Sequence, residues 1–75
     1  MDAGIQPLDS LMEGQSLRNH DLVEASTHNL THKQVQKARH GRKITFRMQK
    51  KILLAWNSLQ GEVFDLEQLF NYRGR

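Results

Sequence analysis

The side chains best suited to chemistry in this sequence are hydrogen-bond donors within Leu30–Lys43. Several recur at intervals of three and four residues, which places them on one side of a helix: Lys33, Gln36, Lys37 and His40. Val35 and Ala38 form a narrow apolar edge on the other side. Because so short a helix with so little apolar surface is not stable alone, we expect it to lean on other elements by that edge. Its cationic face is then left for a partner.

Charge is distributed unevenly along the chain. The net charge is only +3, yet eight of the 11 Lys and Arg residues fall between Lys33 and Lys51. All eight Asp and Glu residues lie outside Ala25–Gln60. A block of one sign attracts polyanions and steers their approach. A solvated basic surface is the alternative, but because the block contains the donor-bearing helix we favour nucleic acid, and DNA in particular.

Two short helices are predicted to position these donors. The donor-bearing helix runs over residues 31–40, because Thr31 and Gln34 have capping-box spacing and Gly41 readily ends a helix. A preceding helix is expected from about His20 to Ser26, with Asn19 or Asp21 as its cap, and residues 27–29 form the turn. Two short helices joined in this way, the second one basic, form a helix-turn-helix pattern.

A longer helix is predicted from Thr45, its cap, to Gly61. One stripe of this helix is expected to supply most of the core: Met48, Ile52, Ala55, Trp56 and Leu59. The fold class is therefore all-α, a small bundle of four to five short helices. Residues 17–61 form the helix-turn-helix core with its long packing helix.

The two ends of the chain carry weaker signals. Residues 1–16 read as a marginal helix after Pro7 or as a tail. Residues 62–75 are too apolar for a disordered end, and a turn or two of helix is expected after Asp65. This C-terminal segment either seals the core or forms a self-association surface.

Several classes of function are not expected. A chain of 75 residues leaves little room for an enzyme cleft, and neither a glycine-rich phosphate loop nor a nucleophile elbow is present. There is no cysteine, and no carboxylate or thiol joins the histidines in metal-ligand spacing: His20, His28, His32 and His40. We therefore expect no metal and no cofactor. Without a secretory signal or a long apolar run, a cytoplasmic protein is predicted, with no membrane partner.

Residues 20–60 resemble the helix-turn-helix domain of the lambda repressor and Cro superfamily. Ala25 matches the small residue of the first helix, Val35 the branched residue in the middle of the recognition helix, and Ala38 a later core position. The resemblance implies that the second helix enters the major groove of duplex DNA. It then implies these base contacts: Thr31, His32, Lys33, Gln36, Lys37 and His40. In that geometry Gln36 can pair with adenine and Lys33 can reach guanine O6 and N7.

The same resemblance implies a set of phosphate contacts and a dimer. The phosphate contacts are Arg39, Arg42, Lys43, Arg47, Lys50 and Lys51. Because one recognition helix reads only a few base pairs, specific binding ordinarily needs two helices about 34 Å apart. A homodimer surface is expected at Leu54, Leu66, Leu69 and Phe70.

Two other functions remain open from the sequence. The same cations can bind structured RNA, although the face lacks interleaved aromatic residues that stack on single-stranded bases. A protein-interaction adaptor is the alternative from a different class, with the long helix and the apolar C-terminal segment holding an acidic partner. Changes at Leu69 and Phe70 would then abolish function, and changes at Gln36 would not.

Overall fold

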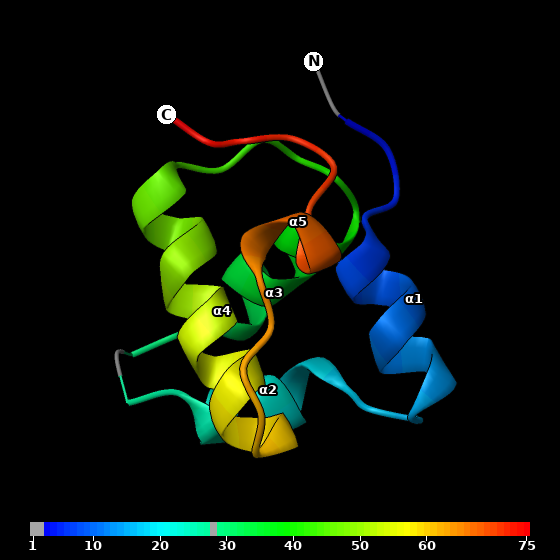
Figure 1. Cartoon of the computed structure of the whole chain (residues 1–75), viewed down its shortest axis with the longest axis vertical. Coiled ribbons are helices and arrows are strands. Elements are labelled where there is room, and N and C mark those ends of the chain that lie inside the picture. Colours follow the sequence, from blue (N-terminus) through cyan, green and yellow to red (C-terminus); the bar gives the residue numbers. More distant parts are fainter. Residues whose placement is uncertain (1–2, 28) are drawn as a thin grey trace.

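A computed structural model describes residues 3–27 and 29–75, which form five helices and no strand. In chain order they are α1 (Pro7–Gly14), α2 (Asn19–Ala25), α3 (His32–Arg39), α4 (Phe46–Gln60) and α5 (Leu66–Leu69) (Figure 1). The prediction of an all-α bundle of four to five short helices is confirmed. Within the described residues, no helix combines the length and apolar character needed to cross a bilayer.

The ends of α3 and α4 are set by local hydrogen bonds that the sequence predicts. The Thr31 hydroxyl accepts from the Gln34 N–H (3.1 Å), and the Thr31 N–H donates to Gln34 Oε1 (3.0 Å). At the start of α4 the Thr45 hydroxyl accepts from the backbone N–H three residues later, at 3.1 Å. Gly61 ends α4 with φ 70°, a left-handed conformation that glycine adopts without a steric penalty.

The start of α2 differs from the prediction. Arg18 is the residue at the cap, and its N–H donates to the Asp21 carboxylate (2.8 Å). Asp21 therefore closes the first turn from within the helix, and Asn19 is its first residue. This frees the Asn19 side chain to reach other elements.

Every helix contributes to one apolar core. The fully or nearly fully buried side chains are Leu8, Met12, Leu22, Leu30, Val35, Ala38, Ile52, Ala55, Trp56, Leu69 and Phe70. Trp56 lies at its centre and meets Phe64 edge to face, with ring centroids 5.7 Å apart. Aromatic pairs prefer this arrangement. α2 packs against α3 and α4, and α1 packs against α3 and α5.

The segment before α1 is held against the end of α3. The Gln6 N–H donates to the Arg39 carbonyl (3.0 Å), and the Ala3 N–H donates to the Gly41 carbonyl (2.7 Å). Gly41 has φ 83°, and a Cβ at this position would lie 1.6 Å from the carbonyl oxygen of Gly4. Only glycine permits this approach, so Gly41 both ends the donor-bearing helix and seats the N-terminal segment.

The C-terminal segment seals the core. Leu69 and Phe70 are buried, so their assignment to a dimer surface is wrong. Two buried glutamines hold the segment: the Asn71 N–H donates to Gln6 Oε1 (2.8 Å), and the Gly74 N–H donates to Gln49 Oε1 (2.8 Å). In Figure 1 the last residues run beside the connection between α3 and α4.

Candidate nucleic-acid interface

α3 divides into two sides as its periodicity predicts. Val35 and Ala38 are buried. The predicted base contacts lie on the solvent side, where Lys37 is half-buried and the others are exposed: Thr31, His32, Lys33, Gln36 and His40. The helix therefore presents a row of hydrogen-bonding side chains and no carboxylate.

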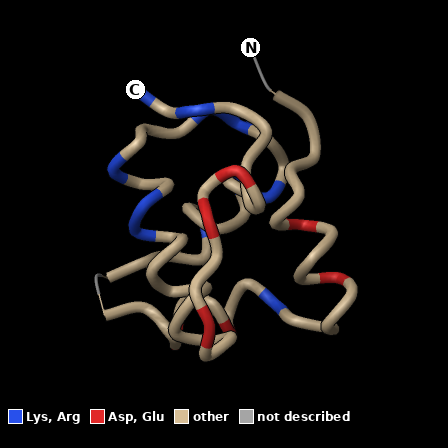
Figure 2. The backbone as a smooth tube through the Cα atoms, in the orientation of Figure 1, with Lys and Arg blue, Asp and Glu red and all other residues tan. Residues whose placement is uncertain are grey.

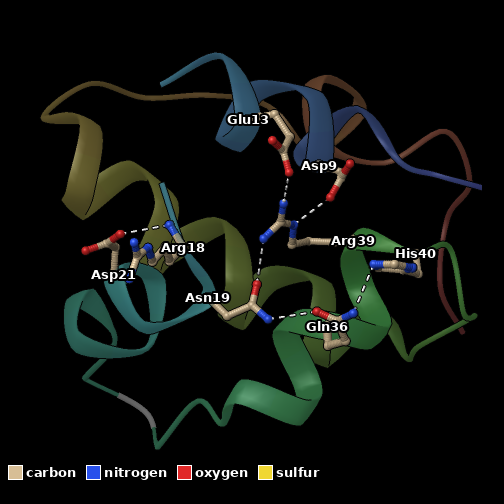
Figure 3. Close-up of polar contacts among 8 residues, drawn as sticks. All are labelled: Asp9, Glu13, Arg18, Asn19, Asp21, Gln36, Arg39 and His40. Carbon is tan, nitrogen blue, oxygen red and sulfur yellow. Dashed lines mark hydrogen bonds and ion pairs between the residues drawn. The ribbon is translucent and has the colours of Figure 1, made fainter. Parts of the chain in front are cut away.

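Arg39 points into the protein rather than toward solvent, so the prediction that it contacts phosphate is wrong. Its side chain is only 11% exposed. Its Nε donates to Asp9 Oδ1 (2.7 Å), its Nη2 to Glu13 Oε1 (3.0 Å), and its Nη1 to Asn19 Oδ1 (2.8 Å). Arg39 thus ties α3 to α1 and α2 (Figure 3).

A signal for this inward position exists in the sequence. Arg39 follows the buried Val35 by four residues, so the two share one side of the helix. An arginine on an apolar edge requires a buried partner. The partner is on α1, a segment whose placement the sequence leaves open.

The hydrogen bonds of Arg39 continue onto the exposed side of α3. Asn19 Nδ2 donates to Gln36 Oε1 (2.8 Å), and Gln36 Nε2 lies 3.0 Å from His40 Nε2. The residues therefore form one polar chain from the α1 carboxylates to the end of α3, as Figure 3 shows. We call the members Arg39, Asn19, Gln36 and His40 the polar chain. Asn19 is a site residue that sequence reasoning took for a helix cap.

Two histidines stack where α2 and α3 begin. The rings of His20 and His32 are 5.7 Å apart and nearly parallel, with 23° between their planes. His20 Nε2 also lies 3.0 Å from a Glu24 carboxylate oxygen. Among the described residues no group of three or more His, Cys, Asp and Glu side chains is arranged to hold a metal; His28 lies outside these residues. The stack is a contact between the first turns of the two helices.

A second concentration of cations surrounds Phe46 at the start of α4. We call it the basic end, and its members are Lys43, Arg47, Lys50, Lys51, Arg73 and Arg75. The Arg73 guanidinium lies 4.7 Å and Lys50 Nζ 5.7 Å from the centre of the Phe46 ring. Cations at this distance are attracted by the face of the ring. The Phe46 N–H also donates to the Arg75 carbonyl (2.8 Å).

Arg73 and Arg75 are the members that the sequence analysis missed. Both are distant from the basic block in sequence, and the buried glutamine Gln49 brings them there by accepting from the Gly74 N–H and donating to the Tyr72 carbonyl. The signal was the repeated arginine at the end of the chain. It gave no indication of which element the arginines would join.

The basic end is continuous with α3. Arg42 and Lys43 are exposed and directly follow its last turn. On the other side, Lys51 Nζ donates to the Asn29 carbonyl (3.4 Å), in the turn that precedes α3. Asn29 itself has φ 57°, as expected for a turn. Figure 2 shows the cations around the start of α4 and the chain end, whereas the acidic residues lie on α1, on α2, around α5 and just beyond the far end of α4.

Comparisons of the chain with protein families, with curated proteins and with solved structures gave no match.

Proposed function

We propose that this protein binds duplex DNA in a sequence-specific manner as a small transcriptional regulator in the cytoplasm. α2 and α3 act as a helix-turn-helix, and α3 lies in the major groove. The observation that carries the proposal is that two surfaces adjoin each other. One is the side of α3 that bears hydrogen-bond donors and no carboxylate, and the other is the basic end. A groove-reading helix needs the first, and anchoring on the phosphates needs the second.

The two surfaces have different roles in this proposal. Exposed side chains of α3 contact base edges, and they alone carry sequence information. Arg42 and the basic end contact phosphates, which sets affinity for every duplex. Each neutralised phosphate adds about −0.9 to the slope of log K against log salt.

A homodimer completes the proposal, because one recognition helix reads only a few base pairs. Of the residues expected at its surface, Leu54 is 54% exposed and Leu66 is half-buried. Leu69 and Phe70 are unavailable because they lie in the core. Sedimentation of the protein with and without DNA tests this part, and a strict monomer on DNA contradicts it.

Selection of duplexes from a random library at physiological salt, followed by sequencing, tests the proposal. We expect a palindrome with half-sites about ten base pairs apart. Gln36→Ala should change the selected sequence, whereas Lys43→Ala should weaken binding to all duplexes and flatten the salt slope. Binding that is strong only at low salt and enriches no motif would indicate non-specific attraction by the cations alone.

An adaptor function is the second candidate, and an open groove on α4 favours it. Phe46 and Leu54 form its apolar floor, and Arg47, Lys50 and Lys51 line it with positive charge. Such a groove suits an acidic amphipathic helix. Fluorescence anisotropy with a labelled acidic amphipathic peptide distinguishes the two candidates. The adaptor requires binding that Leu54→Ser removes and Gln36→Ala leaves unchanged.

A further inference from the structure

The polar chain has a direction, which its one arginine imposes. A guanidinium can only donate hydrogen bonds. The Asn19 side-chain atom 2.8 Å from Arg39 Nη1 must therefore be the carbonyl oxygen, and the amide nitrogen of Asn19 must face Gln36. That nitrogen donates, so the Gln36 atom it meets must be the oxygen. Hence the orientation of both amides follows from Arg39.

The direction continues to His40. With Gln36 Oε1 turned toward Asn19, Gln36 Nε2 faces His40 and donates to its Nε2 at 3.0 Å. An imidazole nitrogen that accepts carries no hydrogen, so the hydrogen of the His40 ring is placed on Nδ1. Each link thus presents a donor to the next one. Arg39 is itself held by Asp9 and Glu13 of α1, and a reversed Asn19 amide would place its NH2 group against the guanidinium and lose the bond to Arg39.

This direction determines which groups α3 offers to a base. Gln36 Oε1 accepts from Asn19 and the Thr31 hydroxyl oxygen accepts from a backbone N–H, so each of these oxygens keeps only one acceptor position. The groups that remain are mostly donors: the second amide hydrogen of Gln36, the Nδ1–H of His40 and the ammonium groups of Lys33 and Lys37. His32 is not counted among these groups because its ring stacks on His20.

Base edges in the major groove differ in what they accept. Guanine presents two acceptors, N7 and O6, whereas adenine presents one acceptor beside the N6 amino donor. A pair of hydrogen bonds from Gln36 to adenine requires its oxygen to accept from N6. We propose that the donor-rich side of α3 recognises guanine edges in duplex DNA, and that Asn19 is the positioning residue that sets this preference. The proposal rests on the proposed function, and it replaces the expectation that Gln36 reads adenine.

The substitution Asn19→Asp reverses the direction without changing the size of the side chain. A carboxylate still accepts from Arg39, but it cannot donate to Gln36. The Gln36 amide therefore turns so that its nitrogen donates to residue 19 and its oxygen takes the place of the nitrogen on the His40 side. That oxygen can accept from the amino group of adenine or cytosine. Asn19→Ala removes the link and leaves the amide free in both orientations.

Asn57→Asp is the matched control. It makes the same change of charge in α4, where Asn57 Oδ1 accepts from the Phe64 N–H (2.8 Å) and a carboxylate can do the same, while the long donation of Asn57 Nδ2 to the Phe64 carbonyl (3.5 Å) is lost just as the donation of Asn19 is. Neither bond involves α3. The added negative charge of Asn57→Asp therefore reproduces the general repulsion of DNA without disturbing the polar chain. Circular dichroism and thermal melting of each variant show whether it is folded.

Selection of duplexes with each variant is the deciding experiment. We expect the wild-type motif to contain guanine at the position that Gln36→Ala relaxes. Asn19→Asp should reduce the preference for guanine over adenine there by roughly tenfold, Asn19→Ala should weaken it, and Asn57→Asp should keep the wild-type motif. A folded Asn19→Asp variant that selects the wild-type motif overturns the proposal, and so does a wild-type motif with adenine at that position. A wild-type protein that selects nothing overturns the proposed function itself.

The tautomer of His40 provides a measurement that needs neither DNA nor a variant. NMR of the free wild-type protein can correlate the ring nitrogens of His40 with the carbon-bound protons of the same ring. The nitrogen shifts then show whether the ring hydrogen is on Nδ1 or Nε2. The proposal requires that His40 carries its hydrogen on Nδ1 and that Nε2 accepts from Gln36. A hydrogen on Nε2 would mean that the polar chain does not run from Arg39, and the proposal would be wrong.

Discussion

The buried guanidinium of Arg39 should be a principal determinant of the stability of this fold. Arg39→Met retains the apolar stem of the side chain and its helix propensity but removes all three charged contacts described above. Asp9 is only 20% exposed and loses its ion partner, and the Asn19 carbonyl loses its donor. The prediction is therefore a large loss of stability from one substitution on the helix that we assign to DNA recognition.

The magnitude follows from the exposure of each partner. A charge-assisted bond to a mostly buried carboxylate contributes about 2 kcal/mol, and leaving the Asn19 oxygen unpaired costs about 1 kcal/mol more. The Glu13 side chain is 72% exposed, so that pair adds at most about 0.5 kcal/mol. We expect a loss of about 3 kcal/mol out of a total stability of about 4–11 kcal/mol for a chain of this length.

Urea unfolding followed by Trp56 fluorescence, together with calorimetry, measures this loss. At about 4–8 °C per kcal/mol for a domain of this size, Tm should fall by about 12–24 °C. Arg47→Met is the matched control, because Arg47 is an exposed residue of α4, and it should change stability by no more than about 0.5 kcal/mol. Asp9→Asn should cost more than Glu13→Gln because Asp9 is the less exposed partner.

One result refutes this reasoning. Buried ion pairs replaced by apolar groups are sometimes neutral or stabilising. If Arg39→Met is as stable as the wild type while Arg47→Met is unchanged, the desolvation of the guanidinium offsets its three hydrogen bonds. Arg39 would then orient the polar chain without stabilising the fold.

Three further outcomes follow from single positions. Gly41→Ala should cost about 2–3 kcal/mol in urea unfolding, since it forces a side chain into a left-handed conformation against the N-terminal backbone. The control Gly14→Ala adds a methyl group in open space at the end of α1 and should be neutral or stabilising. Equal losses of stability in the two variants would contradict this prediction. Leu69→Ala should lower the free energy of unfolding by about 3 kcal/mol because it opens a cavity, whereas Val63→Ala, at an exposed position, should leave it unchanged. A Leu69→Ala variant that changes dimerisation but keeps its stability would contradict the buried position of Leu69. Arg73→Ala should lower the salt slope of duplex binding by about 0.9, and an unchanged slope would remove Arg73 from the phosphate contacts.

The sequence was sufficient for features that depend on neighbouring residues. The capping box of Thr31 and Gln34, the cap at Thr45 and the stop at Gly61 each involve residues within a few positions, so the limits of α3 and α4 follow from residue types. Periodicity also separated the apolar edge of α3 from its cationic side, with Val35 inside and Lys33 outside. The charge block and its lack of carboxylates are properties of the sequence as well.

Tertiary structure decided everything that depends on partners distant in sequence. The spacing of Arg39 from Val35 indicates an inward side chain, but only the packing of α1 against α3 supplies its partner Asp9. Asn19 looks like a cap until α2 and α3 bring it to Gln36, and Leu69 looks like an interface residue until it fills the core. The reason is physical: local signals fix backbone conformation within a turn or two, whereas the orientation of a long polar side chain depends on which donors and acceptors the packed helices bring within about 3 Å.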